Sequence, residues 1–408
     1  MHILLIHQAF ATPHEAGGTR HFELARYLIS KGHNISVLTG NVSYVSGSRM
    51  GGGTEEIIEP GIVVHRVNAS EHLHAGFMGR LWSLLSFMLK SFVAALRIEN
   101  FDIVYGTSPP IFQGFTAYLI SRVKRVPFVF EVRDLWPDFV VQVGAVKSPL
   151  FIYPAKWLEK FLYRKATAII INSPAFLEHI MSKGIEEEKV SMVLNGVETS
   201  MFDPEARGES LREELGLEDK TIVLYAGAIG VSNDISTLLD AARNMRERRE
   251  IVFLLVGGGN QRNAIEARLV GEGIDNVIML PPVPKAEMPT IMAASDIGVA
   301  ILKDVPMFKT VYPNKVFDYM AAGRAVLLAI DGVIRKVVEE AEAGVFVQPG
   351  NPEDIARGVL SLAEDADLRE QMGRNGRKCV EECFERSEQA EQLERVLLGA
   401  LRNREKAT

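Results

Sequence analysis

The chain has 408 residues, 47% of them hydrophobic, which is more than one ordinary core accommodates and predicts about two domains. Its net charge of −7 argues against a general nucleic-acid-binding protein. Two cysteines, Cys379 and Cys383, are too few for a disulfide framework, and no His or Cys cluster adjoins them to complete a zinc site. No apolar run is long enough for a membrane span, and the run at residues 3–6 is typical of a first strand rather than a signal peptide. We therefore expect a cytoplasmic protein with reduced thiols.

Short apolar runs alternate with helical segments along the whole chain. In the first half, strands are predicted at residues 3–6, 35–39, 62–67, 102–105, 128–132, 168–172 and 190–194. After the polar stretch 199–219, strands follow at 221–225, 251–256, 277–280, 297–302 and 326–330. Strands that alternate with helices indicate parallel sheets. We predict an α/β fold of two doubly wound, Rossmann-like domains at residues 1–200 and 201–385, with a C-terminal helix, 386–408, that packs back on the first domain.

One helix, predicted at residues 77–98, permits two interpretations. A stripe with helical spacing favours a helix that covers the sheet; it consists of Leu81, Leu84, Leu85, Met88, Leu89, Phe92, Val93 and Leu96. Trp82 and Phe87 lie off this stripe, near basic residues. The start of the helix and the loop before it could therefore contact a membrane surface peripherally. The two interpretations are compatible.

Two features of the first half are candidate site elements. Gly17 and Gly18 form the first strand-to-helix turn, where backbone N–H groups can face an anion, although a glycine pair also fits a plain tight turn. Arg133 and Asp134 follow the strand 128–132. Ligands bind at the carboxyl ends of strands in open α/β sheets, but an ion pair that only anchors the loop is the alternative.

The second half contains the strongest local pattern, in the stretch from Tyr312 to Val326. A short helix is predicted there, ending at Gly323. Lys315 and Asp318 are spaced i, i+3 and therefore share one face near the helix start. A helix start is a natural phosphate site.

Taken in order, the motifs resemble the family-4 glycosyltransferases of the GT-B fold. They are Gly17-Gly18, Asp134-Leu135-Trp136-Pro137, Asn195-Gly196-Val197, the turn from Gly227 to Gly230, Gly257-Gly258-Gly259, and Pro313-Asn314-Lys315 with Asp318 to Gly323. The resemblance looks closest to the bacterial branch that builds surface polysaccharide and O-antigen units. It implies transfer with retention of a sugar from a nucleotide sugar held between the domains. Asp318, where the family usually has Glu, is then expected at the ribose hydroxyls, and Gly17 and Gly18 at the diphosphate.

The resemblance also indicates the remaining site residues. Arg133 and Asp134 occupy the place of a common His-Asp pair and are the expected catalytic residues. The nucleotide sugar is expected to be surrounded by Gly227, Gly230, Gly258, Val283, Thr310 and Asn314. Three departures stand out. Thr310 replaces the first Glu of a usual pair, Arg133 replaces His, and the usual Arg and Lys are missing from residues 227–234. Lys315 is the expected replacement cation, with Arg20 or Arg133 as helpers.

The chemistry expected from these residues needs no metal. Asp365-Ala366-Asp367 mimics a metal-binding Asp-x-Asp but is better placed to cap a helix. No nucleophilic carboxylate stands out at a strand end, which favours same-face attack, with the leaving phosphate accepting the acceptor's proton and Asp134 orienting hydroxyls.

The resemblance makes a UDP-sugar the default donor, carrying an N-acetylhexosamine or a 6-deoxy analogue; GDP stays open. The expected acceptor is a polyprenyl-diphosphate-linked sugar or an oligosaccharide. Two alternatives stay open: a nucleotide-sugar epimerase and a non-catalytic partner in glycan assembly. A solute-binding protein is not expected, because it would need an export signal and the sequence shows none.

Overall fold

The computed structural model describes residues 1–408 except 43–54, 69–76, 145 and 406–408. The chain divides into two compact units. Unit 1 holds residues 1–12, 17–194 and 387–408, and unit 2 holds residues 13–16 and 195–386. The chain therefore crosses after Leu194, earlier than the expected boundary at residue 200, and returns after Arg386.

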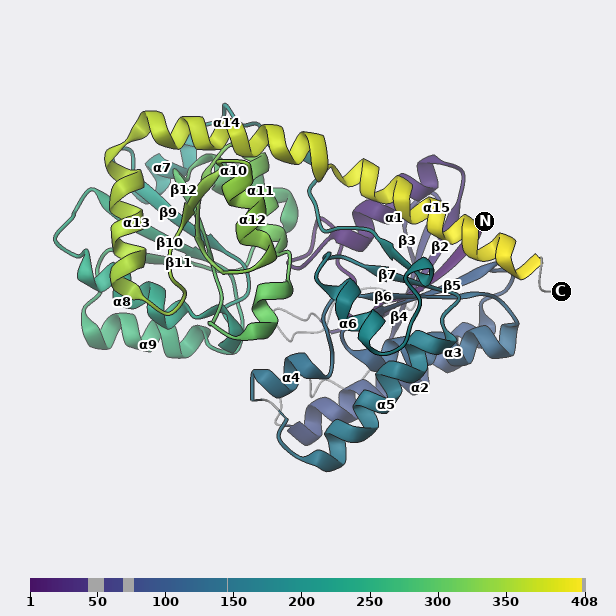
Figure 1. The fold of residues 1–408 in the computed structure, drawn as a ribbon. Coiled ribbons are helices and arrows are strands. Elements are labelled where there is room, and N and C mark those ends of the chain that lie inside the picture. The colour runs from purple at the N-terminus through teal and green to yellow at the C-terminus, as the bar shows by residue number, and fades with distance from the viewer. Residues whose placement is uncertain (43–54, 69–76, 145, 406–408) are drawn as a thin grey trace. The chain divides into compact units, whose positions relative to one another are not determined.

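Unit 1 is built on one eight-stranded sheet (Figure 1). Its strands, in spatial order, are β3 (Glu55–Glu59), β4 (Ile62–Val67), β2 (Asn34–Gly40), β1 (His2–Ile6), β5 (Ile103–Ser108), β6 (Phe128–Val132), β7 (Ala168–Ile171) and β8 (Val190–Met192). All neighbouring pairs are parallel except β3 with β4, so the sequence pattern missed one antiparallel edge strand.

Helices cover both faces of this sheet, which confirms a doubly wound layer structure for unit 1. They are α1 (Arg20–Ser30), α2 (Phe77–Arg97), α3 (Ile111–Lys124), α4 (Asp138–Gln142), α5 (Pro149–Lys165), α6 (Phe176–Ser182) and α15 (Arg386–Glu405). Buried side chains of α1 and α15 share one core with strand residues such as Val37 and Val129. On the other face, the Phe128 ring meets Tyr118 of α3 edge-on, and the Phe130 ring packs at a tilt against Tyr163 of α5.

Helix α2 buries a different face from the one that its sequence predicts. Ser83, Phe87, Ser91 and Ala95, spaced four apart, are buried. Leu89, with 64% exposed, and Val93, with 44% exposed, lie instead beside an open hollow of about 690 Å³ next to β4. Small serines let the helix pack closely on α3, and the Ser91 hydroxyl donates to the Phe87 carbonyl, so its burial leaves no unpaired donor.

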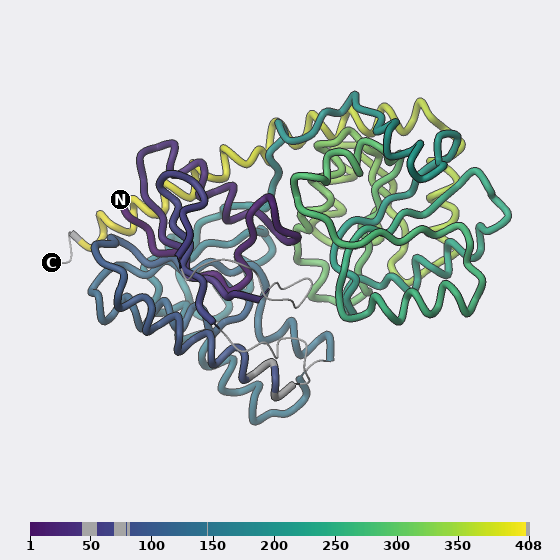
Figure 2. Tube along the Cα trace, turned by 180° about the vertical axis from the view of Figure 1, so that it is seen from behind, coloured from purple at the N-terminus to yellow at the C-terminus, as the bar shows by residue number. Residues whose placement is uncertain are grey.

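Unit 2 repeats the architecture with a six-stranded parallel sheet. Its strands, in spatial order, are β11 (Val277–Leu280), β10 (Ile251–Val256), β9 (Thr221–Ala226), β12 (Ile297–Ile301), β13 (Ala325–Ala329) and β14 (Gly344–Phe346). Its helices are α7 (Glu209–Leu215), α8 (Ile235–Asn244), α9 (Arg262–Glu272), α10 (Met288–Ala293), α11 (Asn314–Ala321), α12 (Val333–Glu340), α13 (Pro352–Glu364) and α14 (Ala366–Cys383). The Cα trace of Figure 2 shows the same alternation from behind.

The two chain crossings lie next to each other within unit 2. Val197 and Arg386 are joined through backbone hydrogen bonds, in which Val197 N–H donates to the Phe384 carbonyl and Arg386 N–H to the Val197 carbonyl. A Cβ on Gly196 would lie 2.1 Å from the Phe384 carbonyl oxygen. This close approach explains why the Asn195-Gly196-Val197 motif needs glycine at its centre.

Within the described part of the chain, no helix combines the length and the apolar character that a membrane span requires.

Candidate functional site

Helix α11 is held firmly against the sheet of unit 2. The Tyr319 hydroxyl oxygen accepts from the Ala226 N–H at 2.9 Å, at the end of β9, and donates to the Val299 carbonyl of β12 at 3.2 Å. Phe317 stacks on Phe384 with ring centroids 4.7 Å apart. The start of the helix is therefore fixed at the carboxyl ends of the central strands, where parallel sheets bind ligands.

Lys315, the second residue of α11, directs its ammonium group beneath the turn that follows β9. Its Nζ lies 3.7 Å from the centre of the Tyr225 ring, is buried, and has no hydrogen-bond partner in the structure. Burial lowers the pKa of Lys315 to about 7. Its charged form is costly there, because among the described residues a ring face, and no hydrogen-bond acceptor, lies next to the buried nitrogen.

Glycines form the turns next to Lys315. Gly227 is exposed, and a Cβ placed on it would come within 3.0 Å of Lys315 Nζ. Gly257 passes so close to Gly227 that a Cβ would lie 1.8 Å from the Gly227 carbonyl oxygen, and Ile229 N–H donates to the Gly258 carbonyl at 2.7 Å. Glycine is therefore required at both positions, because a side chain there would collide with Lys315 or with the neighbouring backbone.

Asp318 lies one turn beyond Lys315 and is paired with a residue that the sequence analysis missed. Lys285 Nζ donates to Asp318 Oδ2 at 2.6 Å, and both side chains are largely buried. Lys285 begins the short 3-10 turn Lys285–Glu287 after β11, and its ammonium also lies over the Phe202 ring. The pair fixes the direction of the Asp318 carboxylate.

The other predicted donor-site residues of unit 2 lie at ends of neighbouring elements. Asn314 opens α11 and has a buried Oδ1 without a hydrogen-bond partner. Thr310 ends the 3-10 turn Pro306–Thr310, where its hydroxyl donates to the Met307 carbonyl at 2.6 Å. Val283 lies in the loop that leads from β11 to Lys285, and Gly230 begins the turn before α8. These residues, together with Lys315 and Asp318, all come from loops and helix starts at the carboxyl ends of strands.

Gly17 and Gly18 lie directly before α1 in unit 1. A Cβ on Gly18 would meet open space, so the turn is unobstructed on that side. Thr19 follows them, and its hydroxyl donates to the Glu23 carboxylate at 2.5 Å. The Thr19 side chain therefore does not cap the N–H groups of the first helical turn. The segment before the pair, 13–16, belongs to unit 2, where the Pro13 carbonyl accepts from the Ala286 N–H.

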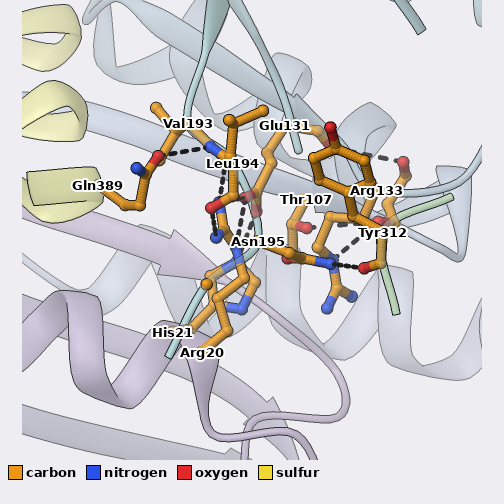
Figure 3. A network of polar contacts seen from close by, with 12 residues as sticks. Arg20, His21, Thr107, Glu131, Arg133, Val193, Leu194, Asn195, Tyr312 and Gln389 are labelled. Atoms are coloured by element: carbon orange, nitrogen blue, oxygen red, sulfur yellow. Dashed lines mark hydrogen bonds and ion pairs between the residues drawn. The ribbon is translucent and has the colours of Figure 1, made fainter. Parts of the chain in front are cut away.

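Arg20 does not act as the predicted helper cation. Its guanidinium is 3% exposed and donates to Glu131 Oε1 at 3.0 and 3.2 Å and to the carbonyls of Val193 and Leu194, each at 2.6 Å (Figure 3). All of these acceptors belong to the end of β6 or the last residues of unit 1. Arg20 is therefore a structural residue, because its donors are already used by the protein.

A buried polar network links this ion pair to Arg133. His21 Nε2 donates to Glu131 Oε2 at 2.5 Å, and the His21 ring lies 4.4 Å from that of His7. His7 Nε2 accepts from Arg133 Nη2 at 3.1 Å. Burial, opposed by Glu131, lowers the pKa of His21 to about 4, and burial together with His21 and Arg133 lowers that of His7. Despite its burial, Glu131 has a lowered pKa, because His21, Arg20 and Arg133 lie next to its carboxylate.

Arg133 and Asp134 do not form the mutual ion pair that was the alternative to a functional role. Arg133 Nε donates to the Ser108 carbonyl at 3.0 Å, and its second contact is to His7. Among the residues that the structure describes, none donates a hydrogen bond to the Asp134 carboxylate. Burial raises the pKa of Asp134 to about 6, against the opposing effect of Arg133. An unpaired carboxylate of this kind, behind a fixed arginine, is suited to orient hydroxyl groups.

Metal ligands do not cluster in the described residues, where no group of three or more His, Cys, Asp or Glu side chains could hold an ion. Asp365 caps α14 by accepting from the Leu368 N–H at 2.9 Å, as the Asp-Ala-Asp motif predicted.

The structure is thus a two-unit α/β protein in which Lys315 and Asp318 of unit 2 lie at the carboxyl ends of the central strands, and comparison with known proteins gives its class. Residues 16–196 match the family described as "Glycosyl transferase 4-like domain". Residues 208–379 match "Glycosyl transferases group 1". The two matches together span most of both units. The chain therefore belongs to the GT-B glycosyltransferases, and it is a glycosyltransferase that takes its sugar from a nucleotide sugar.

Individual relatives are distant but extend over much of the chain. An alpha-D-kanosaminyltransferase of Streptomyces kanamyceticus is 26% identical over 270 residues, which is 64% of this chain and 68% of the relative. A putative colanic acid biosynthesis glycosyl transferase of Escherichia coli is 24% identical over 351 residues, covering 83% of this chain and 86% of the relative. The Anabaena protein HepE, solved in complex with UDP and glucose, has a TM-score of 0.72 at 16% identity, over 98% of this chain and 100% of the other. That structural likeness supports the fold.

Proposed function

We propose that the chain transfers a sugar, with retention of configuration, from a UDP-sugar to a lipid-linked or saccharide acceptor in the synthesis of cell-surface polysaccharide. The observation that carries the donor site is the buried, unpaired Lys315 ammonium beneath the Gly227 turn. A nucleotide sugar is an anion whose leaving group gains charge as the glycosidic bond breaks. A fixed cation aimed at the departing phosphate stabilises that charge.

The remaining donor contacts follow from this placement. Asp318 accepts the ribose hydroxyls, and Lys285 holds its carboxylate in the direction that binding requires. Asp is one methylene shorter than the Glu that the family usually has here, and the fixed direction of the carboxylate offsets the shorter side chain. Gly17 and Gly18 offer N–H groups to the diphosphate. Lys315 carries the charge that Arg and Lys after β9 usually carry in the family, since residues 227–234 contain neither.

On the acceptor side, Arg133 and Asp134 orient hydroxyl groups of the reacting sugars. The Arg133 guanidinium is held by His7 and the Ser108 carbonyl, so its position is set before substrate arrives. The acceptor hydroxyl attacks on the face that the leaving phosphate vacates, and a phosphate oxygen takes its proton. The reaction as proposed needs neither a nucleophilic carboxylate nor a metal.

The acceptor and setting are proposed from the family branch and from the colanic acid relative. We propose an N-acetylhexosamine or 6-deoxy donor sugar, a polyprenyl-diphosphate-linked or oligosaccharide acceptor, and a cytoplasmic enzyme in peripheral contact with the membrane. The loop at 69–76, where the sequence placed part of that contact, lies outside the described residues.

A ligand screen by thermal shift with UDP-sugars and GDP-sugars tests activity class and donor together, because a ligand that binds only the folded state raises the melting temperature. We expect stabilisation by UDP-sugars and sugar transfer once an acceptor is added. Epimerised or hydrolysed donor in the absence of acceptor would support the epimerase alternative instead. If no nucleotide sugar in the screen raised the melting temperature, the result would contradict the proposal. The anomeric configuration of the product, read by NMR, tests retention.

A further inference from the structure

Helix α5 of unit 1 presents large apolar side chains to solvent along one face. Leu150, Tyr153 and Trp157 are 83%, 74% and 64% exposed, and their i, i+3, i+7 spacing places them on one stripe. Phe151 beside them is 44% exposed. Single exposed apolar residues are ordinary, but four within the first nine residues of one helix form a patch that a soluble surface normally avoids.

The patch is surrounded by positive charge. Lys147 precedes the helix, and α5 itself contains Lys156, Lys160, Arg164 and Lys165. Its one carboxylate, Glu159, is buried and bound to His179 at 2.8 Å and Lys183 at 3.2 Å, so it does not reach the surface. Lys156 contacts Asp138 of α4 at 3.0 Å but keeps 46% of its side chain exposed. The exposed face of α5 is therefore both aromatic and basic.

Helix α2 extends this surface within the same helix layer. Both helices pack against α3, and Tyr118 of α3 meets Phe161 of α5 edge-on at 5.0 Å. The residue of α2 that extends this surface lies in the first half of the helix. Trp82 in that half of α2 is 64% exposed, and α2 contains no acidic residue from Phe77 to Arg97. The aromatic and basic character is thus shared by neighbouring helices.

We infer that this face, defined as the exposed residues of α5 together with Trp82, docks onto the surface of a bilayer that carries anionic phospholipid. Tyr and Trp bury a ring at the depth of the headgroups while a polar tip stays wet, and lysine side chains reach the lipid phosphates. Amphipathic helices that lie in the interface combine these residue types. Protein interfaces, by contrast, are depleted in lysine. Charge and residue type together favour lipid over a protein partner.

This inference extends the proposed membrane contact by naming the surface and the lipid class, and it moves the main contact from the start of α2 to α5. It does not depend on donor chemistry. The docking face belongs to α2 and α5 of unit 1, whereas Lys315 and Asp318 belong to unit 2.

Co-sedimentation of the full chain with vesicles tests the proposal. We expect binding to phosphatidylcholine vesicles that contain phosphatidylglycerol, about tenfold weaker binding to phosphatidylcholine alone, and loss of the difference at high salt. The triple variant Leu150→Ser/Tyr153→Ser/Trp157→Ser should bind the anionic vesicles at least about tenfold more weakly, because it removes most of the buried apolar area. Val270→Ser is the matched control, since Val270 is an apolar helix residue of unit 2 with 85% exposed.

Several outcomes would overturn the proposal. One is equal vesicle binding by the triple variant and the wild type. Another is vesicle binding that does not depend on lipid charge or on salt concentration. A third is that light scattering without vesicles finds a dimer of the wild type and a monomer of the triple variant. The face would then be an interface between copies of the chain. Calorimetry with UDP on the same variants separates the two proposals: the triple variant should bind UDP like the wild type. Failure of the wild type to bind UDP would contradict the donor site and leave the vesicle result standing.

Discussion

Two buried cations, Arg20 in unit 1 and Lys315 in unit 2, occupy similar places and have opposite surroundings. Each stands at the beginning of a helix that follows a loop at the carboxyl end of a strand. Arg20 donates to one carboxylate and two backbone carbonyls, whereas Lys315 Nζ lies over the Tyr225 ring and finds no acceptor among the residues that the structure describes. A cation whose partners are built into the protein stabilises the fold. One that is buried without partners is held for a ligand, and its burial is a cost to the fold.

The largest effect is expected when Arg20 loses its charge. Arg20→Met removes the arginine of the buried Arg20–Glu131 ion pair, which should cost about 3–5 kcal/mol of unfolding free energy. Urea denaturation measures this loss. The double variant Arg20→Met/Glu131→Leu should recover much of it, because no uncompensated charge then remains. A single variant as stable as the wild type would show that Arg20 is not the structural residue described above.

Lys315→Met should weaken ligand binding and leave stability intact, the opposite of what we expect for Arg20→Met. Affinity for UDP should fall by about 2–3 kcal/mol, roughly 30- to 150-fold, since a charge-assisted contact to the diphosphate is lost. Stability should not fall, because a buried unpaired ammonium is removed. Calorimetry and urea denaturation of the same sample measure both, with Lys336→Met on the exposed side of α12 as control. A Lys315→Met variant that loses stability but keeps its affinity for UDP would show that Lys315 serves the fold and not the ligand.

A smaller effect is expected at Lys285. Lys285→Met frees the Asp318 carboxylate to turn away, and the affinity for uridine and for UDP should fall by the same amount, about 1 kcal/mol or roughly fivefold. Lys315→Met, by contrast, should weaken UDP far more than uridine. If each variant lost the same affinity for uridine as for UDP, Lys285 would not act on the ribose and Lys315 would not act on the phosphate.

A further prediction concerns how stability depends on pH. The pKa of Lys315 is about 7 in the folded protein and near 10.4 in an unfolded chain, so the unfolded state binds more protons between these values. Unfolding free energy should therefore rise with pH in that window through this group. Denaturation series between pH 7 and 9 should show a shallower rise for Lys315→Met than for the wild type. Identical slopes would contradict the lowered pKa.

The local patterns of the sequence predicted much of the fold and the outline of the donor site. Alternating runs gave both sheets, and the i, i+3 spacing of Lys315 and Asp318 placed them on one helix face. What failed depended on distant partners. Arg20 meets Glu131 across 111 residues and Val193 across 173, and Lys285 meets Asp318 across 33, so no spacing rule could relate them. Helix α2 shows a different limit: periodicity reveals an apolar stripe, but close packing through Ser83 and Ser91 decided which face is buried.

Proton uptake on donor binding tests the central claim, that Lys315 is the cation that receives the diphosphate. At pH 8 free Lys315 is mostly neutral, and a bound diphosphate raises its pKa, so binding should draw a proton from the buffer. Titrating UDP-glucose, whose phosphates do not ionise in this range, in buffers of different ionisation enthalpy should report uptake of close to one proton (about 0.9) in the wild type and none in Lys315→Met. No uptake by the wild type, or equal uptake by the variant, would contradict the account.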